Sequence, residues 1–289
     1  MELTFKKALL VFVILFGAIF AGQEITNARN EKTESLEVNF MDVGQGDATL
    51  INYLGKHQVL IDGGPNGKEF LYRLGKVMPW GDKEIEVVVL THPDKDHLAG
   101  LIDLAENYKV GIFLYNGQSA ETEIYKQLQE TLVEKNIKQE ILLEGSNINI
   151  GKHLKLKVFS PDVLITEDKK RNEQSIVLRM DFGENSFLFT GDAEMKTEKD
   201  MIDDEEDLDV DYLKVGHHGS KHSTSKEFLA KVTPEYAIIS SGKDNRFGHP
   251  ASEVLEKLNL IRAKIFRTDE KGTVKVVCRN IKEKCYLKE

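Results

Sequence analysis

The chain has 289 residues and a formal net charge of −9, so it is long enough to bury a large core in one or two domains. Its negative charge argues against broad electrostatic capture of nucleic acid. An anionic substrate is not excluded, because bound metal cations would reverse the sign of the potential at their own site.

Residues 1–22 are predicted to form a signal peptide or a membrane anchor. Two lysines precede an apolar run from Ala8 to Ala21, which is shorter than the roughly 20 residues that a spanning helix needs. We therefore expect a protein that is secreted or held at the extracellular face of the membrane, with cleavage or retention of the segment left open. Residues 23–35 are polar and aperiodic and predict a linker, so the folded body is expected over residues 36–289.

The folded body alternates strand and helix patterns, with glycines between them. Short apolar runs predict strands at 36–40, 48–51, 58–61, 87–90, 110–114, 154–159, 175–180, 187–189, 211–215, 236–239 and 264–266. Helical periodicity predicts helices at 69–78, 98–108, 121–135, 194–202, 225–232 and 252–260. No repeat or internal linker interrupts this order, so one α/β domain is expected.

The only two cysteines, Cys278 and Cys285, lie in the last two predicted strands, 273–278 and 284–287. In an oxidising compartment, a disulfide across these strands is one interpretation. Two free buried thiols are the other interpretation, and the sequence does not decide between them.

Residues 91–97 read Thr-His-Pro-Asp-Lys-Asp-His directly after an apolar predicted strand. They contain four side chains that bind metals, His92, Asp94, Asp96 and His97. In extended backbone, the first two can point the same way, while the last two lie at a turn into a helix. One ion is not expected to use all four ligands from so short a stretch, so we predict two adjacent cation sites.

Other predicted strands also end in residues that bind metals or orient ligands. These residues are Asp62, Asp192, His217, His218 and, further on, His249. Loops at strand ends on a rigid sheet are a common location for enzyme chemistry, so we expect these side chains to form one site.

Six phrases together resemble the metallo-β-lactamase superfamily, and within it the C-terminal hydrolase domain of ComEC-type competence proteins. They are Asp-Val-Gly-Gln-Gly-Asp-Ala at 42–48, the 91–97 loop, Asn-Glu-Gln-Ser at 172–175, Leu-Phe-Thr-Gly-Asp-Ala-Glu at 188–194, Leu-Lys-Val-Gly-His-His-Gly-Ser at 213–220 and Asn-Arg-Phe-Gly-His-Pro at 245–250. The resemblance covers about residues 36 to 270 and implies an α/β fold of the αββα sandwich type, with a dinuclear metal site at one edge of the two sheets. The membrane channel part of competence proteins is not found in the sequence, so we expect a stand-alone, exported form of that domain.

The resemblance also implies a ligand set for the two ions. The first ion would bind His92, Asp94 and Asp192, and the second would bind Asp96, His97, Asp192 and His217, with Asp192 bridging. The sequence does not decide between His217 and His218, although family position favours His217 and leaves His218 beside it as a catalytic candidate.

Two departures from the superfamily pattern affect which metal ions the site is expected to bind. Asp94 stands where the superfamily usually has a histidine, and Asn172 and Ser175 occupy the region of its usual third histidine. The first site is therefore rich in oxygen ligands, so two divalent ions, Zn²⁺ or Mn²⁺, are expected as cofactors.

Several residues are expected to act around the ions. Asp96, His218 and His249 are the catalytic candidates, and His249 is expected to protonate the leaving group or to stabilise developing charge. Asp62 and Asp47 either orient the site or only stabilise turns. The other candidates for supporting the site or contacting substrate are Asn172, Ser175, Lys214, Ser220 and His222, of which His222 is expected to be a surface residue.

These features predict an exported metal-dependent hydrolase, a phosphodiesterase or nuclease acting on DNA, with a hydroxide held by the ions as nucleophile. The expected partner is a phosphodiester substrate such as single-stranded DNA, because the chain has no long basic run. The alternatives are an envelope phosphocholine esterase, a lactone or ester hydrolase, and a non-catalytic binding protein for DNA uptake. The sequence does not give the oligomeric state.

Overall fold

The computed structural model describes residues 34–162, 171–204 and 206–288. The predicted signal or anchor and almost all of the predicted linker lie outside these described residues. Within them, no helix is long and apolar enough to cross a membrane.

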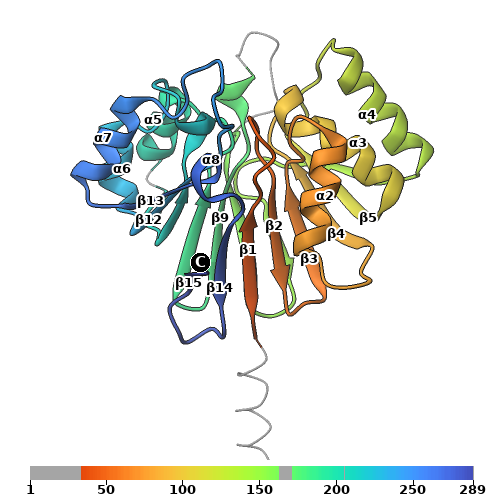
Figure 1. The fold of residues 1–289 in the computed structure, drawn as a ribbon, viewed down its shortest axis with the longest axis horizontal. Coiled ribbons are helices and arrows are strands. Elements are labelled where there is room, and N and C mark those ends of the chain that lie inside the picture. Colours follow the sequence, from red (N-terminus) through yellow and green to blue (C-terminus); the bar gives the residue numbers. More distant parts are fainter. Residues whose placement is uncertain (1–33, 163–170, 205, 289) are drawn as a thin grey trace, which may run out of the picture.

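Two β-sheets pack face to face, and helices cover the outer face of each sheet (Figure 1). α2 (Gly67–Val77), α3 (Lys95–Asn107) and α4 (Glu123–Glu134) pack on the first sheet. α5 (Met195–Asp203), α6 (Lys226–Val232) and α7 (Ser252–Leu260) pack on the second. This arrangement confirms the predicted α/β fold of the αββα sandwich type.

The first sheet combines strands from the N-terminal half with the two last strands of the chain. β3 to β6 run parallel, so their carboxyl ends lie at the same edge of the sheet. In spatial order the strands are β15 (Tyr286–Lys288), β14 (Val274–Cys278), β1 (Leu36–Phe40), β2 (Thr49–Tyr53), β3 (His57–Ile61), β4 (Glu84–Leu90), β5 (Lys109–Tyr115) and β6 (Lys138–Ile141).

The second sheet has seven strands from the C-terminal half of the chain. Its strands β10 to β13 also run parallel to one another. In spatial order the strands are β13 (Lys264–Arg267), β12 (Tyr236–Ile239), β11 (Tyr212–Lys214), β10 (Asn185–Phe189), β9 (Val177–Phe182), β8 (Leu154–Ser160) and β7 (Asn147–Ile150).

The core has three layers that follow from the apolar faces of these elements. The central layer lies between the sheets and includes the fully buried Phe40 and Leu178. The outer layers lie between each sheet and its helices, as around Phe70 and Phe228. A parallel strand with both faces buried has a continuous apolar run rather than an alternating one, as at residues 87–90 in β4.

Cys278 and Cys285 form a disulfide that joins β14 to the start of β15. The structure thus decides between the two interpretations that the sequence left open. Both cysteines are buried in the layer between the sheets. The backbone of Cys285 donates a 2.7 Å hydrogen bond to Asn185 and accepts a 2.8 Å one from the Tyr212 hydroxyl, so the C-terminal hairpin is tied to the second sheet.

The elements that the sequence did not predict are short or exposed. β6 and β7 lie at the ends of the two sheets, and most of their residues are exposed or only partly buried. Edge strands of this kind carry polar side chains and lack the apolar runs that predict a strand. The remaining short elements are α8 (Thr268–Lys271) and the 3-10 turns η1 (Asn172–Gln174) and η2 (Gly216–Gly219).

Candidate metal centre

Loops from the two sheets meet at one edge of the sandwich. β4 ends at Leu90 and α3 begins at Lys95, so residues 91–94 form a short connection between a buried strand and a helix. From the second sheet, the loop that follows β10 carries Asp192. The order of the strands therefore brings the predicted metal loop and Asp192 together, although about 100 residues separate them in the sequence.

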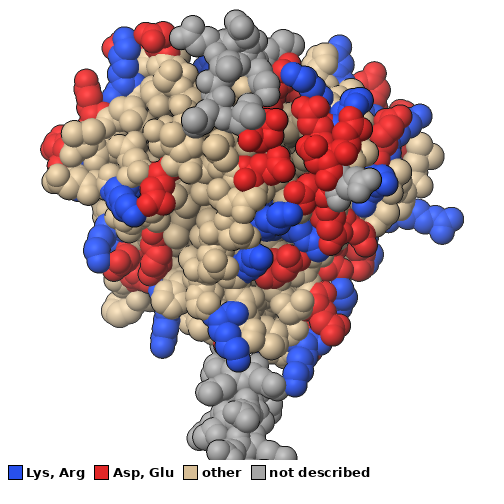
Figure 2. Space-filling view, turned by 180° about the vertical axis from the view of Figure 1, so that it is seen from behind, with Lys and Arg blue, Asp and Glu red and all other residues tan. Residues whose placement is uncertain are grey.

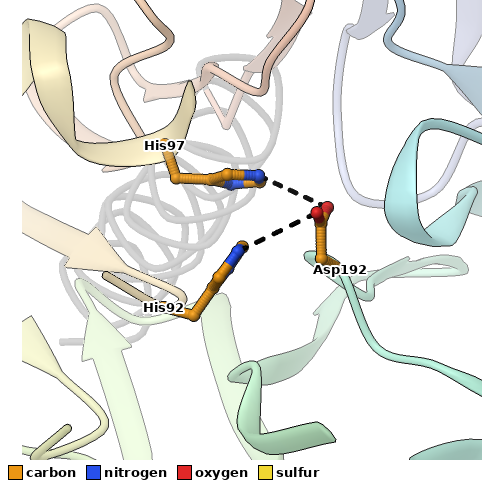
Figure 3. A group of neighbouring side chains, drawn as sticks. All are labelled: His92, His97 and Asp192. Atoms are coloured by element: carbon orange, nitrogen blue, oxygen red, sulfur yellow. Dashed lines mark ion pairs between the residues drawn. The ribbon is translucent and has the colours of Figure 1, made fainter. Parts of the chain in front are cut away.

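His92, His97 and Asp192 point toward one another (Figure 3). Nε2 of His97 lies 3.3 Å from Oδ1 of Asp192, and Nε2 of His92 lies 3.8 Å from Oδ2. All three side chains are buried. The Asp192 carboxylate thus lies between two imidazoles, out of contact with most of the solvent.

His218 brings a third imidazole to the same carboxylate. Its Nε2 lies 3.6 Å from Oδ1 of Asp192 and 3.4 Å from Oδ2 of Asp96. Overlapping groups of mutually close donor atoms result, among them His92 with His97 and Asp192, Asp96 with His97 and His218, and Asp47 with Asp192 and His218. The arrangement could accommodate two adjacent cations.

Asp62, at the end of β3, fixes the orientation of the histidine loop. Its Oδ2 accepts hydrogen bonds of 2.8 Å from Nδ1 of His97 and from the Thr91 hydroxyl, and its Oδ1 accepts a 2.9 Å bond from the Thr91 N–H. Because the Thr91 hydroxyl donates to Asp62, it can accept from Nδ1 of His92, 3.1 Å away. Both imidazoles then carry their proton on Nδ1 and present a lone pair on Nε2 to Asp192.

Asp47 and Ser240 hold His218 in the same way. Nδ1 of His218 lies 3.0 Å from the Ser240 carbonyl oxygen and 3.2 Å from Oδ1 of Asp47, so Nδ1 is the protonated nitrogen. Oδ2 of Asp47 pairs with Nζ of Lys214 at 2.6 Å. Burial alone would raise the pKa of Asp47, but the charges of Lys214 and His218 outweigh it and lower the pKa.

Four buried atoms at the centre have no hydrogen-bond partner among the described residues. They are Nε2 of His92, His97 and His218 and Oδ1 of Asp192. A buried polar atom without a partner costs about 1–3 kcal/mol, so a cluster of four calls for a ligand. Imidazole nitrogens with anchored Nδ1–H groups and a shared carboxylate are a donor set that fits divalent metal ions.

The carboxylate and the imidazoles of the centre shift one another's pKa. Burial would raise the pKa of Asp192, but the charges of His218 and His97 outweigh burial and hold the pKa well below its usual range. Burial would likewise lower the pKa of His218, yet the carboxylates of Asp192 and Asp47 raise it to about 10. The negative charge of the donor set therefore attracts either protons or metal cations.

His217 lies at the rim of the centre, whereas His218 points into it. Nδ1 of His217 lies 3.4 Å from Glu194, and the Asn172 amide nitrogen lies 3.4 Å from both ring nitrogens. Its Nε2 is 3.7 Å from Asp192, and the groups of close donors contain His218 in its place. The geometry thus favours His218 as the ligand, whereas family position favoured His217. The ligand role of His217 stays a prediction.

The backbone conformation explains why sequence position could not show which of these two histidines points into the centre. His217 and His218 have φ values of 47° and 54°, in the left-handed region that side chains other than glycine seldom adopt. Asp62 has a φ of 61° as well. Such backbone strain concentrates at functional sites, where the surrounding structure stabilises it, and no spacing rule predicts which side chain it turns inward.

Asp94 lies at the open side of the centre. Its Oδ2 is 3.6 Å from Nε2 of His92, and its Oδ1 pairs with the guanidinium of Arg171 at 2.5 Å. Burial would raise the pKa of Asp94, but its contacts with His92 and Arg171 lower it. Sequence reasoning missed Arg171, because the charged run at 167–171 is typical of a solvated surface.

Two residues in the region of the absent third histidine support other groups. The Ser175 hydroxyl accepts a 3.2 Å hydrogen bond from the backbone N–H of Asp192. Asn172 contacts His217, as described above. The structure therefore places both beside the donor set as polar supports of the bridging carboxylate and of the rim histidine.

Lys214, Ser220 and His222 do not point into the open side of the centre. Lys214 is buried and contacts Asp47 and, at 3.0 Å, the carbonyl oxygen of Val215, so it lies behind His218. Ser220 is also buried, and its hydroxyl accepts a 3.3 Å bond from the N–H of His222. His222 itself is exposed, as expected of a surface residue.

His249 lies next to the rim, with its ring centroid 5.6 Å from that of His217 and 6.4 Å from that of His218. Partial burial and the nearby charges of His218 and His217 lower its pKa to about 4. The imidazole of His249 is therefore neutral at physiological pH. Its Nδ1 is buried and has no hydrogen-bond partner in the described part of the chain.

Residues 41–142, which contain the 91–97 loop, match the family model described as Metallo-beta-lactamase superfamily. The chain contains a metallo-β-lactamase domain. The superfamily consists generally of metal-dependent hydrolases, so the fold implies the divalent-metal binding that the donor set fits.

Curated relatives connect this metallo-β-lactamase chain to competence proteins. Competence protein ComA of Neisseria gonorrhoeae is 28% identical over 82% of this chain and 31% of its own length. ComE operon protein 3 of Bacillus subtilis is 34% identical over 84% of this chain and 33% of its own length. Recombination protein 2 of Haemophilus influenzae is 31% identical over 90% of this chain and 31% of its own length. The chain thus spans about a third of the length of these relatives, and the resemblance to ComEC-type competence proteins is confirmed.

Solved structures with little sequence identity share the fold. The metallo-beta-lactamase fold protein YhfI from Bacillus subtilis has a TM-score of 0.58 at 11% identity, over 85% of this chain and 100% of its own. Zn²⁺-bound PqqB from Methylobacterium extorquens has a TM-score of 0.50 at 11% identity, over 77% of this chain and 85% of its own. At this identity the likeness supports the fold alone.

Proposed function

We propose that this protein is an exported, metal-dependent phosphodiesterase that cleaves DNA, with a preference for single strands or ends. The observation that carries the proposal is the convergence of three unpartnered Nε2 atoms, from His92, His97 and His218, on the buried carboxylate of Asp192. This geometry suits divalent cations, and divalent cations serve the hydrolysis of phosphodiesters in many enzymes.

In this proposal Asp192 would serve both ions. His92 and Asp94 would complete one set of ligands, and Asp96, His97 and His218 would complete the other. When bound, the ions supply a nucleophile at neutral pH and neutralise charge on the reacting phosphate. Zn²⁺ and Mn²⁺ both fit, since the set mixes imidazole nitrogens with carboxylate oxygens.

The residues around the ions have distinct proposed roles. Arg171 is partly exposed beside Asp94, where its guanidinium can pair with a substrate phosphate. His249 is neutral because its pKa is near 4, so it positions the phosphate by hydrogen bonding rather than carrying a proton to the leaving group. This proposal revises the role in proton transfer that the sequence suggested for His249.

The surface charge supports a substrate that meets the protein through few phosphates. The chain has a net charge of −9, and acidic side chains gather on the right half of the face in Figure 2. A long duplex brings many phosphates near such a surface and is repelled. A single strand or an end can enter a metal centre through a few phosphates, where the cations reverse the local sign.

The relatives supply the biological context of the proposal. Their names refer to competence and recombination, and this favours a role in DNA uptake at the cell envelope. Export through residues 1–22 would bring the domain to that location.

The test is a cleavage assay with labelled single- and double-stranded DNA and protein loaded with Mn²⁺ or Zn²⁺. We expect faster cleavage of the single strand, loss of cleavage with EDTA, and no cleavage by the variant His97→Ala. Binding of DNA without cleavage would instead support the accessory binding protein. No action on DNA, together with rapid turnover of a phosphocholine ester or a lactone, would identify one of the other hydrolases.

A further inference from the structure

The loop at residues 242–249 holds an aromatic ring in the solvent beside the metal centre. Phe247 is 55% exposed and lies two residues before His249. An apolar ring in this position gains little from burial, so the stability of the fold does not explain it. An exposed aromatic ring next to a site is a feature that ligands with flat rings can use.

Hydrogen bonds fix the loop that carries Phe247. Oδ1 of Asn245 accepts bonds from the backbone N–H groups of Phe247 at 3.1 Å and His249 at 3.0 Å. The backbone N–H of Gly242 donates a 3.1 Å bond to Gln45, which lies in the loop after β1. The exposed ring is therefore held in one place relative to the site and loses little freedom when a ligand binds.

The Phe247 ring is the outer member of a series that leads to the metal centre. Its centroid lies 5.8 Å from that of His249, and the two planes differ by 25°, so the rings are close to parallel. The His249 ring in turn lies 5.6 Å from the ring of His217 and 6.4 Å from that of His218. If the phosphate of a ligand is held at the centre, the group next to that phosphate can reach the Phe247 ring.

Arg246 determines which flat or charged groups this ring can accept. Its guanidinium lies 4.9 Å from the centroid of Phe247, and it pairs with no carboxylate in the described part of the chain. A positive charge next to the ring repels a quaternary ammonium group, which disfavours a phosphocholine ester at this position. The same charge attracts phosphate, while the phenyl plane can stack on a nucleobase.

We propose that Phe247 is a base-stacking residue that, together with Arg246, binds the nucleotide next to the phosphate held at the metal centre. This inference rests on the proposed function and names the groups that would select a strand with unstacked bases. Bases in an intact duplex are stacked on one another, so this contact favours single strands and frayed ends.

The test compares two labelled strands of equal length, one of thymidine nucleotides and one of abasic sugar phosphates. With metal-loaded protein, Phe247→Ala should lower kcat/KM for the thymidine strand about 10-fold and leave the abasic strand unchanged, since stacking on one base accounts for a loss of that size. Phe247→Trp should restore the rate. Phe247→Leu, which keeps an apolar side chain without a ring, should not.

The variant Arg246→Ala distinguishes the contribution of the guanidinium charge from that of stacking on the Phe247 ring. Because the guanidinium acts on phosphate, this variant should slow both strands by the same factor. Equal kinetics of Phe247→Ala and the wild type on the thymidine strand would overturn the stacking role, even if DNA is cleaved. If the wild type cleaves neither strand, DNA cleavage is rejected, and fluorescence anisotropy then tests the stacking role. Tighter binding of the thymidine strand that Phe247→Ala abolishes supports stacking, and equal binding of the two strands by the wild type rejects it.

Discussion

At the scale of single residues, Asp192 is the carboxylate on which the centre depends. Its two oxygens face His92, His97 and His218, and its backbone N–H is held by Ser175. In the proposed arrangement, each oxygen of this carboxylate would face a different cation, so Asp192 would contribute to both sites. Asp94, at the open side, contacts one site only.

The first prediction follows from this difference. Asp192→Ala should lose both equivalents of metal, while Asp94→Ala should keep at least one, because in the proposed arrangement Asp192 would contribute to both sites and Asp94 to one. Elemental analysis of the purified variants measures this, with Asp200→Ala, a change of an exposed carboxylate, as the control. Equal loss of metal from the Asp192 and Asp94 variants would rule out the bridging arrangement.

The second prediction uses the adjacent histidines as a matched pair. His218→Ala should lower the metal content, because Nε2 of His218 is buried among the donors and Nδ1 is anchored by Ser240 and Asp47. His217→Ala should retain most of the metal, since His217 lies at the rim. Elemental analysis and isothermal titration with Zn²⁺ compare the two. If His217→Ala instead loses more metal than His218→Ala, the result would support His217, the ligand that family position favours.

At the scale of elements, apolar runs were sufficient to predict most of the fold. Buried strands such as β4 and β10 are short and apolar, and a polar loop follows each. The donors at their carboxyl ends could therefore be named in advance. What the sequence could not supply were partners across the two sheets, such as Asp47 with Lys214, because such a contact depends on the packing of strands that lie far apart in the sequence.

The C-terminal hairpin shows the same limit and gives the third prediction. The spacing of Cys278 and Cys285 allowed a disulfide, but only the pairing of β14 with β15 places the two side chains together. The double variant Cys278→Ala, Cys285→Ala should lower the free energy of unfolding by about 2 kcal/mol, because the bridge closes a short loop. Denaturant titration measures it. Wild-type protein with reductant should behave like the variant, and no change in either would contradict a stabilising disulfide.

At the scale of the whole molecule, the site differs from the rest of the surface in its charge and in its position at one edge of the sandwich. The sandwich gathers cation-binding groups at one edge, while the chain has a net charge of −9. Acidic side chains gather on the right half of the face in Figure 2. Two sheets contribute to the centre, and contacts such as Gly242 with Gln45 join their loops. Attraction for a polyanion is therefore local, and it depends on bound metal more than on a basic surface.

The last prediction tests this local attraction through salt. Each phosphate that a protein contacts on a single strand contributes about −0.7 to the slope of log binding constant against log salt concentration. A metal-dominated centre with Arg171 and Arg246 beside it should contact few phosphates, so we expect a slope no steeper than about −2 for metal-loaded protein and a single-stranded oligonucleotide. Arg246→Ala should make the slope shallower, whereas Lys109→Ala, a change of an exposed lysine paired with Glu84, should leave it unchanged. Fluorescence anisotropy across salt concentrations gives the slope, and a value several times steeper would show that DNA lies along an extended basic surface instead.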